Sequence, residues 1–229
     1  PSFFTPAVLA QAKKDLGADA YAGQHGQRPA PPEGIIFKRS WWKRWRKPGD
    51  FVPEGTEARL LPAAFDDMLI SVDAAFKDTD GSDNVAMGVW GRLGPDRFLI
   101  DQACRRMSFT ETIHQLLDLI NAYPKARTRL IEGKANGPAV ISVLKKKVTG
   151  LIEIEPEGGK EARAHAVSPD VEAGNVYVPM HAPWVHEYLE ELCAFPKAMH
   201  DDQVDQTTQA LLRFAKGRSG AAATEALAG

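Results

Sequence analysis

Carboxylate side chains occur at three distant places in the chain where each could bind a metal ion. Asp73 ends the apolar run at 69–72, and Glu132 ends the short run at 129–131. The third place is the sequence His-Asp-Asp-Gln-Val-Asp at 200–205. Carboxylates that are brought together repel one another unless a cation lies between them, and hard divalent ions prefer oxygen ligands. Two such ions can hydrolyse a phosphodiester, because one prepares the attacking water and the other stabilises the leaving oxygen. The three acidic positions therefore favour a metal-dependent nuclease.

The acidic run at 200–205 is compatible with more than one ligand set. In a regular helix from residue 201, Asp201 and Asp205 lie one turn apart on one face, and Asp205 also follows Asp202 by three residues. Asp201 could instead be the N-cap of that helix, where its carboxylate would accept a backbone hydrogen bond. His200 could contact a phosphate, although a lone histidine is more often structural. The spacing alone does not decide between these arrangements.

Composition limits the classes of protein to which the chain can belong. Its 229 residues are 44% apolar, which suffices for one large domain with a short extension. No run approaches the ~20 apolar residues of a membrane span, and no secretory signal opens the chain. Cys104 and Cys193 fit neither a CxxC pair nor a disulfide framework, so we expect a reduced, cytoplasmic setting. Without a Gly-x-x-x-x-Gly-Lys-Ser/Thr loop, this piece should not hydrolyse ATP by itself.

Hydrophobic periodicity predicts the order three strands, helix, strand, helix, strand and then further helices. The first three strands are joined by short turns, which indicates an antiparallel meander. Ser108 with Glu111 three residues later forms a capping box that begins the next helix. The predicted strands are 68–72, 85–90, 97–100 (extending as far as 107), 128–131, 151–154 and 176–178. The predicted helices begin at 108, 138 and 183; a loop at 155–163 leads into a short one, and the last runs from 200 to 216 until Gly217 ends it.

The two ends of the chain differ from its centre. Residues 1–60 are rich in proline and glycine, with one predicted helix at 5–16, and we expect the folded domain to occupy 61–217. The tail at 218–229 is small and featureless, so we expect disorder there. Six basic residues alternate with three tryptophans at 38–47. They could contact DNA or a neighbouring domain, or form a linker whose rings pack while its charges stay solvated. A first residue other than methionine suggests a fragment of a longer protein.

Several of these segments resemble the nuclease motifs of tailed-phage terminase large subunits. The first motif is similar to Ile-Ser-Val-Asp-Ala-Ala-Phe-Lys-Asp at 70–78 with Gly-Ser-Asp-Asn-Val-Ala at 81–86, and the second to Leu-Ile-Glu-Gly-Lys-Ala-Asn-Gly at 130–137. The third motif and its approach resemble the segments 172–179, 182–184, 190–196 and 200–205. The segment 16–29 is similar to the connector between the family's ATPase motor and its nuclease. The resemblance covers about residues 5–215 in order, and together the motifs are specific.

The resemblance implies an α/β fold of the RNase H-like class, a mixed sheet of five or more strands flanked by helices. It also implies two Mg²⁺ or Mn²⁺ ions, with Asp73 bridging both. The catalytic set carried over from the family is Asp73, Glu132, Asp201 and Asp202. We expect at least one of Asp201 and Asp202 to bind metal directly, with Asp205 as a supporting ligand. Asp83 matches a family position near the site, and Lys160 and Arg163 fall in the segment that shapes the DNA groove in this family, although they could also be ordinary surface charges. We further expect His200 beside the ligands and Lys134 against DNA.

The activity that the resemblance implies is an endonuclease that cuts concatemeric double-stranded phage DNA during genome packaging. Its expected partners are double-stranded DNA, an N-terminal ATPase domain joined through residues 1–60, the portal protein and the small terminase subunit, with no membrane. Its expected location is the cytoplasm of the infected bacterial host. Two alternatives remain at this stage. One is another RNase H-like nuclease, such as a junction resolvase or a transposase, and the other is an inactive nuclease that serves as a docking arm of a packaging motor.

Overall fold

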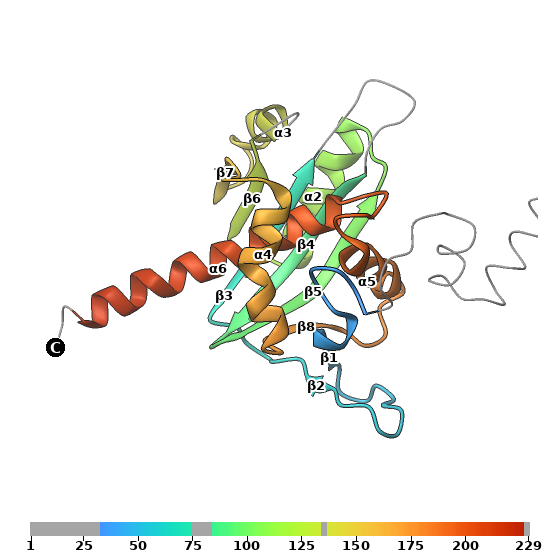
Figure 1. Ribbon diagram of the computed structural model, residues 1–229. Helices are drawn as coiled ribbons and strands as arrows, with labels where there is room; N and C mark the ends of the chain where they lie inside the picture. The colour runs from blue at the N-terminus through green and yellow to red at the C-terminus, as the bar shows by residue number, and fades with distance from the viewer. Residues whose placement is uncertain (1–32, 75–83, 134–136, 227–229) are drawn as a thin grey trace, which may run out of the picture.

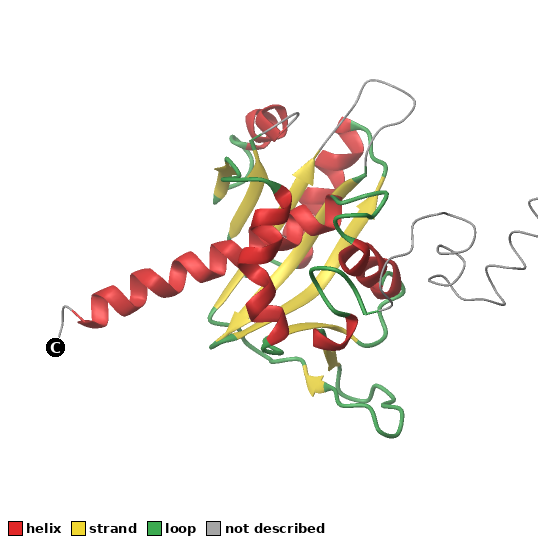
Figure 2. Ribbon diagram, viewed as in Figure 1, coloured by secondary structure: helices red, strands yellow, loops and turns green. Residues whose placement is uncertain are grey.

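The computed structural model describes residues 33–74, 84–133 and 137–226. The predicted helix at 5–16 and two predicted site residues, Asp83 and Lys134, lie outside these ranges. Strands and helices form one layered body in which helices cover both faces of a twisted sheet (Figures 1 and 2). Among the helices of the described residues, none is both long enough and apolar enough to cross a membrane.

The sheet has eight strands in the order β2-β1-β8-β5-β4-β3-β6-β7. β3, β4 and β5 form the predicted antiparallel meander. β6 runs parallel to β3, and β7 runs parallel to β6, so the sheet is mixed as predicted. The bounds are β1 Lys43–Arg46, β2 Arg59–Leu60, β3 Asp67–Ala74, β4 Val85–Leu93, β5 Asp96–Arg105, β6 Thr128–Glu132, β7 Leu151–Ile154 and β8 Val176–Pro179.

The two faces of the sheet carry separate apolar cores, because successive side chains of a strand point to opposite faces. In β3, Leu69 packs into the core beneath α4, α5 and α6, whereas Ile70 and Val72 pack into the core beneath α2 and α3. All three side chains are fully buried, as expected for a central strand covered on both faces. The helix bounds are α2 Phe109–Ala122, α3 Gly137–Leu144, α4 Lys160–Glu172, α5 Val185–Ala194 and α6 Asp202–Ala226, with a 3₁₀ turn η1 at Arg39–Trp41.

The start of α2 confirms the predicted capping box. The Ser108 hydroxyl accepts a hydrogen bond from the backbone N–H of Glu111 at 3.3 Å. The Glu111 carboxylate in turn accepts from the backbone N–H of Ser108 at 2.8 Å. Two backbone donors that a helix start leaves without helical partners are thereby satisfied.

The N-terminal side of the sheet extends beyond the predicted domain. β1 pairs with β8, and β2 pairs with β1, so residues before 61 belong to the same sheet. Phe37, Trp42 and Trp45 are each at most 4% exposed. The predicted domain start at residue 61 is therefore too late. The burial of three large rings outweighs the proline and glycine signals on either side, because each ring removes a large apolar area from water.

Two helix predictions also need correction. α6 continues through Gly217 to Ala226, so the predicted helix end and the predicted disordered tail from 218 are wrong for residues 218–226. A glycine inside a helix costs only about 1 kcal/mol relative to alanine, and the alanines at 221–223 favour helix. The short helix expected after 163 begins earlier, since α4 starts at Lys160, and it extends over 13 residues.

Candidate metal centre

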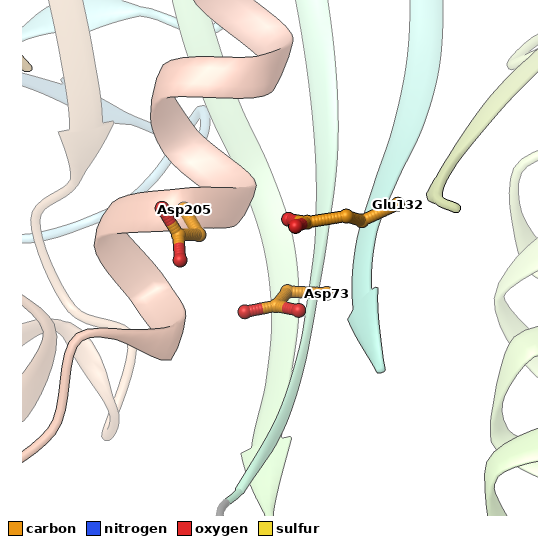
Figure 3. Close-up of side chains that lie close together, drawn as sticks. All are labelled: Asp73, Glu132 and Asp205. Carbon is orange, nitrogen blue, oxygen red and sulfur yellow. The ribbon is translucent and has the colours of Figure 1, made fainter. Parts of the chain in front are cut away.

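Three carboxylates from three elements meet at one edge of the sheet (Figure 3). Asp73 is the last residue but one of β3, Glu132 is the last residue of β6, and Asp205 lies in the first turn of α6. One ligand atom of each residue lies within 4.8 Å of the others. The β3–β6 pairing explains half of this arrangement, because Val72 lies opposite Ile131 in parallel register, which brings the next residue of each strand to the same level.

Hydrogen bonds between α6 and β3 position Asp205, the third carboxylate. The Ser71 hydroxyl donates to the Gln206 carbonyl at 2.7 Å and accepts from the Gln209 side chain at 3.0 Å. Ser71 and Asp73 are two residues apart in a strand, so both face α6. The same contacts that join α6 to β3 therefore bring Asp205 to the level of Asp73.

The environment of Asp73 is unfavourable for its negative charge. Asp73 is only 9% exposed. Burial raises its pKa well above the usual aspartate value, and the negative charges of Asp205, Glu132 and Asp202 raise the pKa further. Lys160 acts in the opposite direction with a smaller effect. A bound divalent cation would relieve this repulsion between neighbouring carboxylates.

Two cations from the first turn of α4 contact acidic side chains at and just before the start of α6. The Lys160 ammonium lies 2.6 Å from Oδ1 of Asp201 and 2.8 Å from Oδ2 of Asp205. The Arg163 guanidinium lies 2.5 Å from Oδ1 of Asp205 and donates a second hydrogen bond to the Gly158 carbonyl at 3.1 Å. Burial works against the charge of Lys160, but its hydrogen bonds to Asp201 and Asp205 prevail and raise its pKa. Lys160 is therefore charged at neutral pH.

The remaining predicted residues of the acidic run lie around this centre. Asp201 precedes α6, is partly exposed, and pairs with Lys160. Asp202 is 5% exposed and is close enough to raise the pKa of Asp73. His200 lines a different cavity, beside Glu191 and Cys104. Asp205, which the sequence suggested only as a supporting residue, is thus the member of the run that joins Asp73 and Glu132.

A cavity of about 320 Å³ opens next to the centre, between the end of β7, α4 and α6. Glu132, Asp205 and Arg163 line it together with Glu155, a residue that the sequence analysis did not select. Glu155 directly follows β7, the strand beside β6. Its position after a short apolar run, like that of Asp73 and Glu132, was the signal that could have identified it.

The donor set suits a hard divalent cation. Every candidate ligand offers carboxylate oxygens, which Mg²⁺ and Mn²⁺ prefer to nitrogen or sulfur. The mutual repulsion of these groups favours a bound cation of high charge. Such ions, when bound to carboxylates beside a phosphodiester, supply Lewis-acid activation and an activated water.

Comparison with known proteins identifies the family and the fold. The sequence matches the family described as Terminase RNaseH-like domain over residues 70–214, more than half of the chain. No curated protein matches the sequence. The fold is similar to the large terminase nuclease of thermophilic phage G20c with bound magnesium, at 15% identity and a TM-score of 0.54, covering 79% of this chain and 98% of that one. The same nuclease with bound cobalt gives 16% identity and a TM-score of 0.53, with 79% and 98% covered.

A longer relative shows how much of a whole protein this chain represents. The large terminase of a second thermophilic bacteriophage is 11% identical with a TM-score of 0.54, over 91% of this chain and 51% of that one. The chain thus spans about half the length of that large terminase. Identities this low show likeness of fold alone, whereas the family match extends over the strands and the helix that carry the three carboxylates. The chain belongs to the terminase RNase H-like domain family, and its fold is that of a terminase nuclease domain.

Proposed function

We propose that this domain is a divalent-metal-dependent endonuclease that cuts concatemeric double-stranded phage DNA during genome packaging. The observation that supports it most directly is the meeting of Asp73, Glu132 and Asp205 within 4.8 Å in a chain of the terminase nuclease family. The magnesium and cobalt found in the related G20c nuclease support metal binding at this fold.

In the proposed mechanism, two Mg²⁺ or Mn²⁺ ions would be held by Asp73, Glu132 and the acidic start of α6. Asp73 would be a ligand of this site, where the ions would supply Lewis-acid activation and an activated water. Asp205 contributes the third carboxylate of the group, and the partly exposed Asp201 and the buried Asp202 are the further candidates. Arg163 fixes the orientation of Asp205, so the position of this carboxylate is set before an ion binds.

DNA would be held mainly through its phosphates. Net charge is −2, so positive charge must be concentrated locally to bind a polyanion. The sequence candidates at the first turn of α4 are Lys160 and Arg163, and Lys160 is the stronger of the two, because it is partly exposed whereas Arg163 is buried against Asp205. Lys134 is the proposed third contact. Backbone contacts carry no sequence information directly, so we expect little sequence preference in cutting.

The proposed biological context follows from the length of the longer relative. That large terminase is about twice as long as this chain, and we propose that residues 1–60 connect the chain to an N-terminal ATPase domain. The portal protein and the small terminase subunit are the further proposed partners, and the cytoplasm of the infected bacterium is the proposed location. The segment 33–60 would then act both as connector and as part of the sheet.

A plasmid cleavage assay tests the activity. The purified chain should nick and linearise supercoiled plasmid in Mn²⁺ or Mg²⁺, and EDTA should stop the reaction. Cleavage that continues unchanged in EDTA would refute the metal mechanism. A folded protein that binds metal but leaves DNA intact would support the docking-arm alternative. A strong preference for a four-way junction over linear duplex would instead support a resolvase-like activity.

A further inference from the structure

The two cations of α4 differ in how firmly they are held. The Arg163 side chain is 9% exposed and is anchored to both Asp205 and the Gly158 carbonyl. The Lys160 side chain is 44% exposed, and its partners are the carboxylates of Asp201, just before α6, and Asp205 in α6. An arginine fork is fixed by its two-sided hydrogen bonding, whereas a lysine ammonium is a mobile, strongly hydrated point charge. Lys160 is therefore the cation that can leave.

The contacts of Lys160 involve an oxygen that the proposed metal site needs. Both oxygens of Asp205 carry a cation, with Arg163 at Oδ1 and Lys160 at Oδ2. Asp205 is also one of the three carboxylates that lie within 4.8 Å of one another. A divalent ion bound to Asp205 would lie about 2–2.6 Å from its ligand oxygen. An ammonium 2.8 Å from Oδ2 would then be at strongly repulsive distance from that ion.

We propose that Lys160 is a built-in competitor of the divalent ions, which neutralises Asp201 and Asp205 and must release Asp205 when a metal ion binds there. Arg163 remains in place and keeps Asp205 oriented. Lys160 thereby lowers the affinity of the centre for metal. It also stabilises the start of α6, because it reduces the repulsion between Asp201 and Asp205. This inference rests on the proposed metal-dependent function and adds a determinant of metal affinity to it.

The released side chain acquires a second partner in this scheme. Once it leaves Asp205, the Lys160 ammonium lies at the border of the metal centre with its charge uncompensated on that side. A DNA phosphate that approaches the centre is the anion that fits this position. Metal binding and the availability of Lys160 to DNA are therefore coupled, because one carboxylate cannot serve both cations.

Mn²⁺ titration calorimetry on the whole chain, without DNA, tests the competition. Lys160→Gln removes the charge, and Lys160→Arg retains it. Lys125→Gln is the control: it removes a positive charge from the exposed turn between α2 and β6, and α2 covers the other face of the sheet. Lys160→Gln should bind Mn²⁺ on the order of tenfold more tightly, since up to two partly exposed ion pairs no longer compete. Lys160→Arg and Lys125→Gln should bind like the wild type. Circular dichroism melting checks that each variant is folded.

The outcomes separate this inference from the proposed function. If the wild type binds Mn²⁺ and Asp73→Asn abolishes that binding, the metal site stands. Should Lys160→Gln then bind no more tightly than Lys125→Gln, or bind more weakly, the competition is refuted and the metal site survives. If neither the wild type nor Lys160→Gln binds Mn²⁺, both proposals fail. An unfolded Lys160→Gln is replaced by Lys160→Met, which keeps the length of the side chain without its charge and gives the same two readings.

Discussion

At the scale of single residues, the position of Asp73 in its strand decides its chemistry. Alternation along β3 places Asp73 on the same face as Ser71, toward α6. Burial and three neighbouring carboxylates make its ionised form costly, which the raised pKa expresses. A strand residue at this point would stabilise the fold more if it were neutral. Acidic groups held at such a cost are typical of functional sites.

Asp73→Asn should abolish cleavage while stabilising the fold in EDTA. We expect a loss of activity greater than about 100-fold, since even partners of metal ligands typically contribute 10–100-fold. The melting temperature in EDTA at neutral pH should rise, because a charge that burial disfavours is removed. Asp118→Asn, at an exposed position of α2, is the matched control and should change neither quantity. A large fall in melting temperature with cleavage retained would make Asp73 a structural residue.

The pH dependence of this difference has a definite sign. The folded pKa of Asp73 is raised above its unfolded value, so the folded state binds the proton more tightly. Wild-type stability therefore falls relative to Asp73→Asn as pH rises from the unfolded pKa of about 3.9 toward the folded one. Urea unfolding in EDTA measures the difference in free energy of unfolding between Asp73→Asn and the wild type. This difference should increase with rising pH and then stay constant. A difference that decreases over this range would contradict a raised pKa of Asp73.

At the scale of elements, the seam between α6 and the sheet sets the geometry of the centre. The indole N–H of Trp90 in β4 donates to Oε1 of Gln206 at 3.1 Å, and the Tyr188 hydroxyl of the neighbouring helix α5 pairs with that of Thr207 at 2.7 Å. Gly88 lets α6 approach β4, because a Cβ at this position would lie 2.2 Å from Oε1 of Gln206. The helix is thus held by polar side chains whose partners are specific, which fixes its rotation as well as its distance.

Gly88→Ala should destabilise the domain by about 1–3 kcal/mol, the usual cost of overpacking a close contact. Gln206→Ala removes the nearest clashing atom, so the double variant should lose less stability than the sum of the two single variants. Urea unfolding of the four proteins in this cycle provides the coupling energy. Strict additivity would show that the contact between β4 and α6 is looser than the structure indicates.

At the scale of the whole molecule, DNA binding depends more on where the charges lie than on the net charge. The chain carries 28 basic and 30 acidic residues, and the carboxylates of the centre would repel a DNA backbone. In the proposed scheme, bound divalent ions would reverse the local sign of the charge and would free Lys160 from Asp205. Metal binding should therefore be the step that converts a nearly neutral surface into one that binds a polyanion.

Binding of a short duplex should be weak in EDTA and stronger in Ca²⁺, with a steep dependence on salt. In Ca²⁺, Lys160→Gln should lower the slope of log K against log salt by roughly 0.9, the value for one lost phosphate contact. In EDTA, where Lys160 is bound to Asp201 and Asp205, the same substitution should leave the slope unchanged. Fluorescence anisotropy over a salt series measures the slope in Ca²⁺ and the slope in EDTA, with Lys125→Gln as the control. Equal slopes in Ca²⁺ would exclude Lys160 from the DNA contact.

The sequence by itself determined the elements from β3 to α5 and placed Asp73 and Glu132 at the ends of strands. Short apolar runs bounded by turns predicted the strands of the meander, and the Ser108–Glu111 box predicted the start of α2. Asp73 and Glu132 could be selected because each ends such a run. These features depend on interactions between residues that are near in sequence, so a single chain displays them.

Tertiary structure alone decided which member of the acidic run completes the centre. Asp205 rather than Asp201 meets Asp73 and Glu132 because Ser71, Gln206 and Gln209 fix how α6 lies on β3. The pairing of Lys160 and Arg163 with that run brings together α4 and α6, although the paired residues are some forty positions apart in the chain. The inclusion of Trp42 and Trp45 in the core likewise depends on β1 reaching β8. Contacts between distant segments leave no periodic signal in a sequence. Their energy depends on which residues pack together in the folded chain, and the local sequence pattern does not identify those residues.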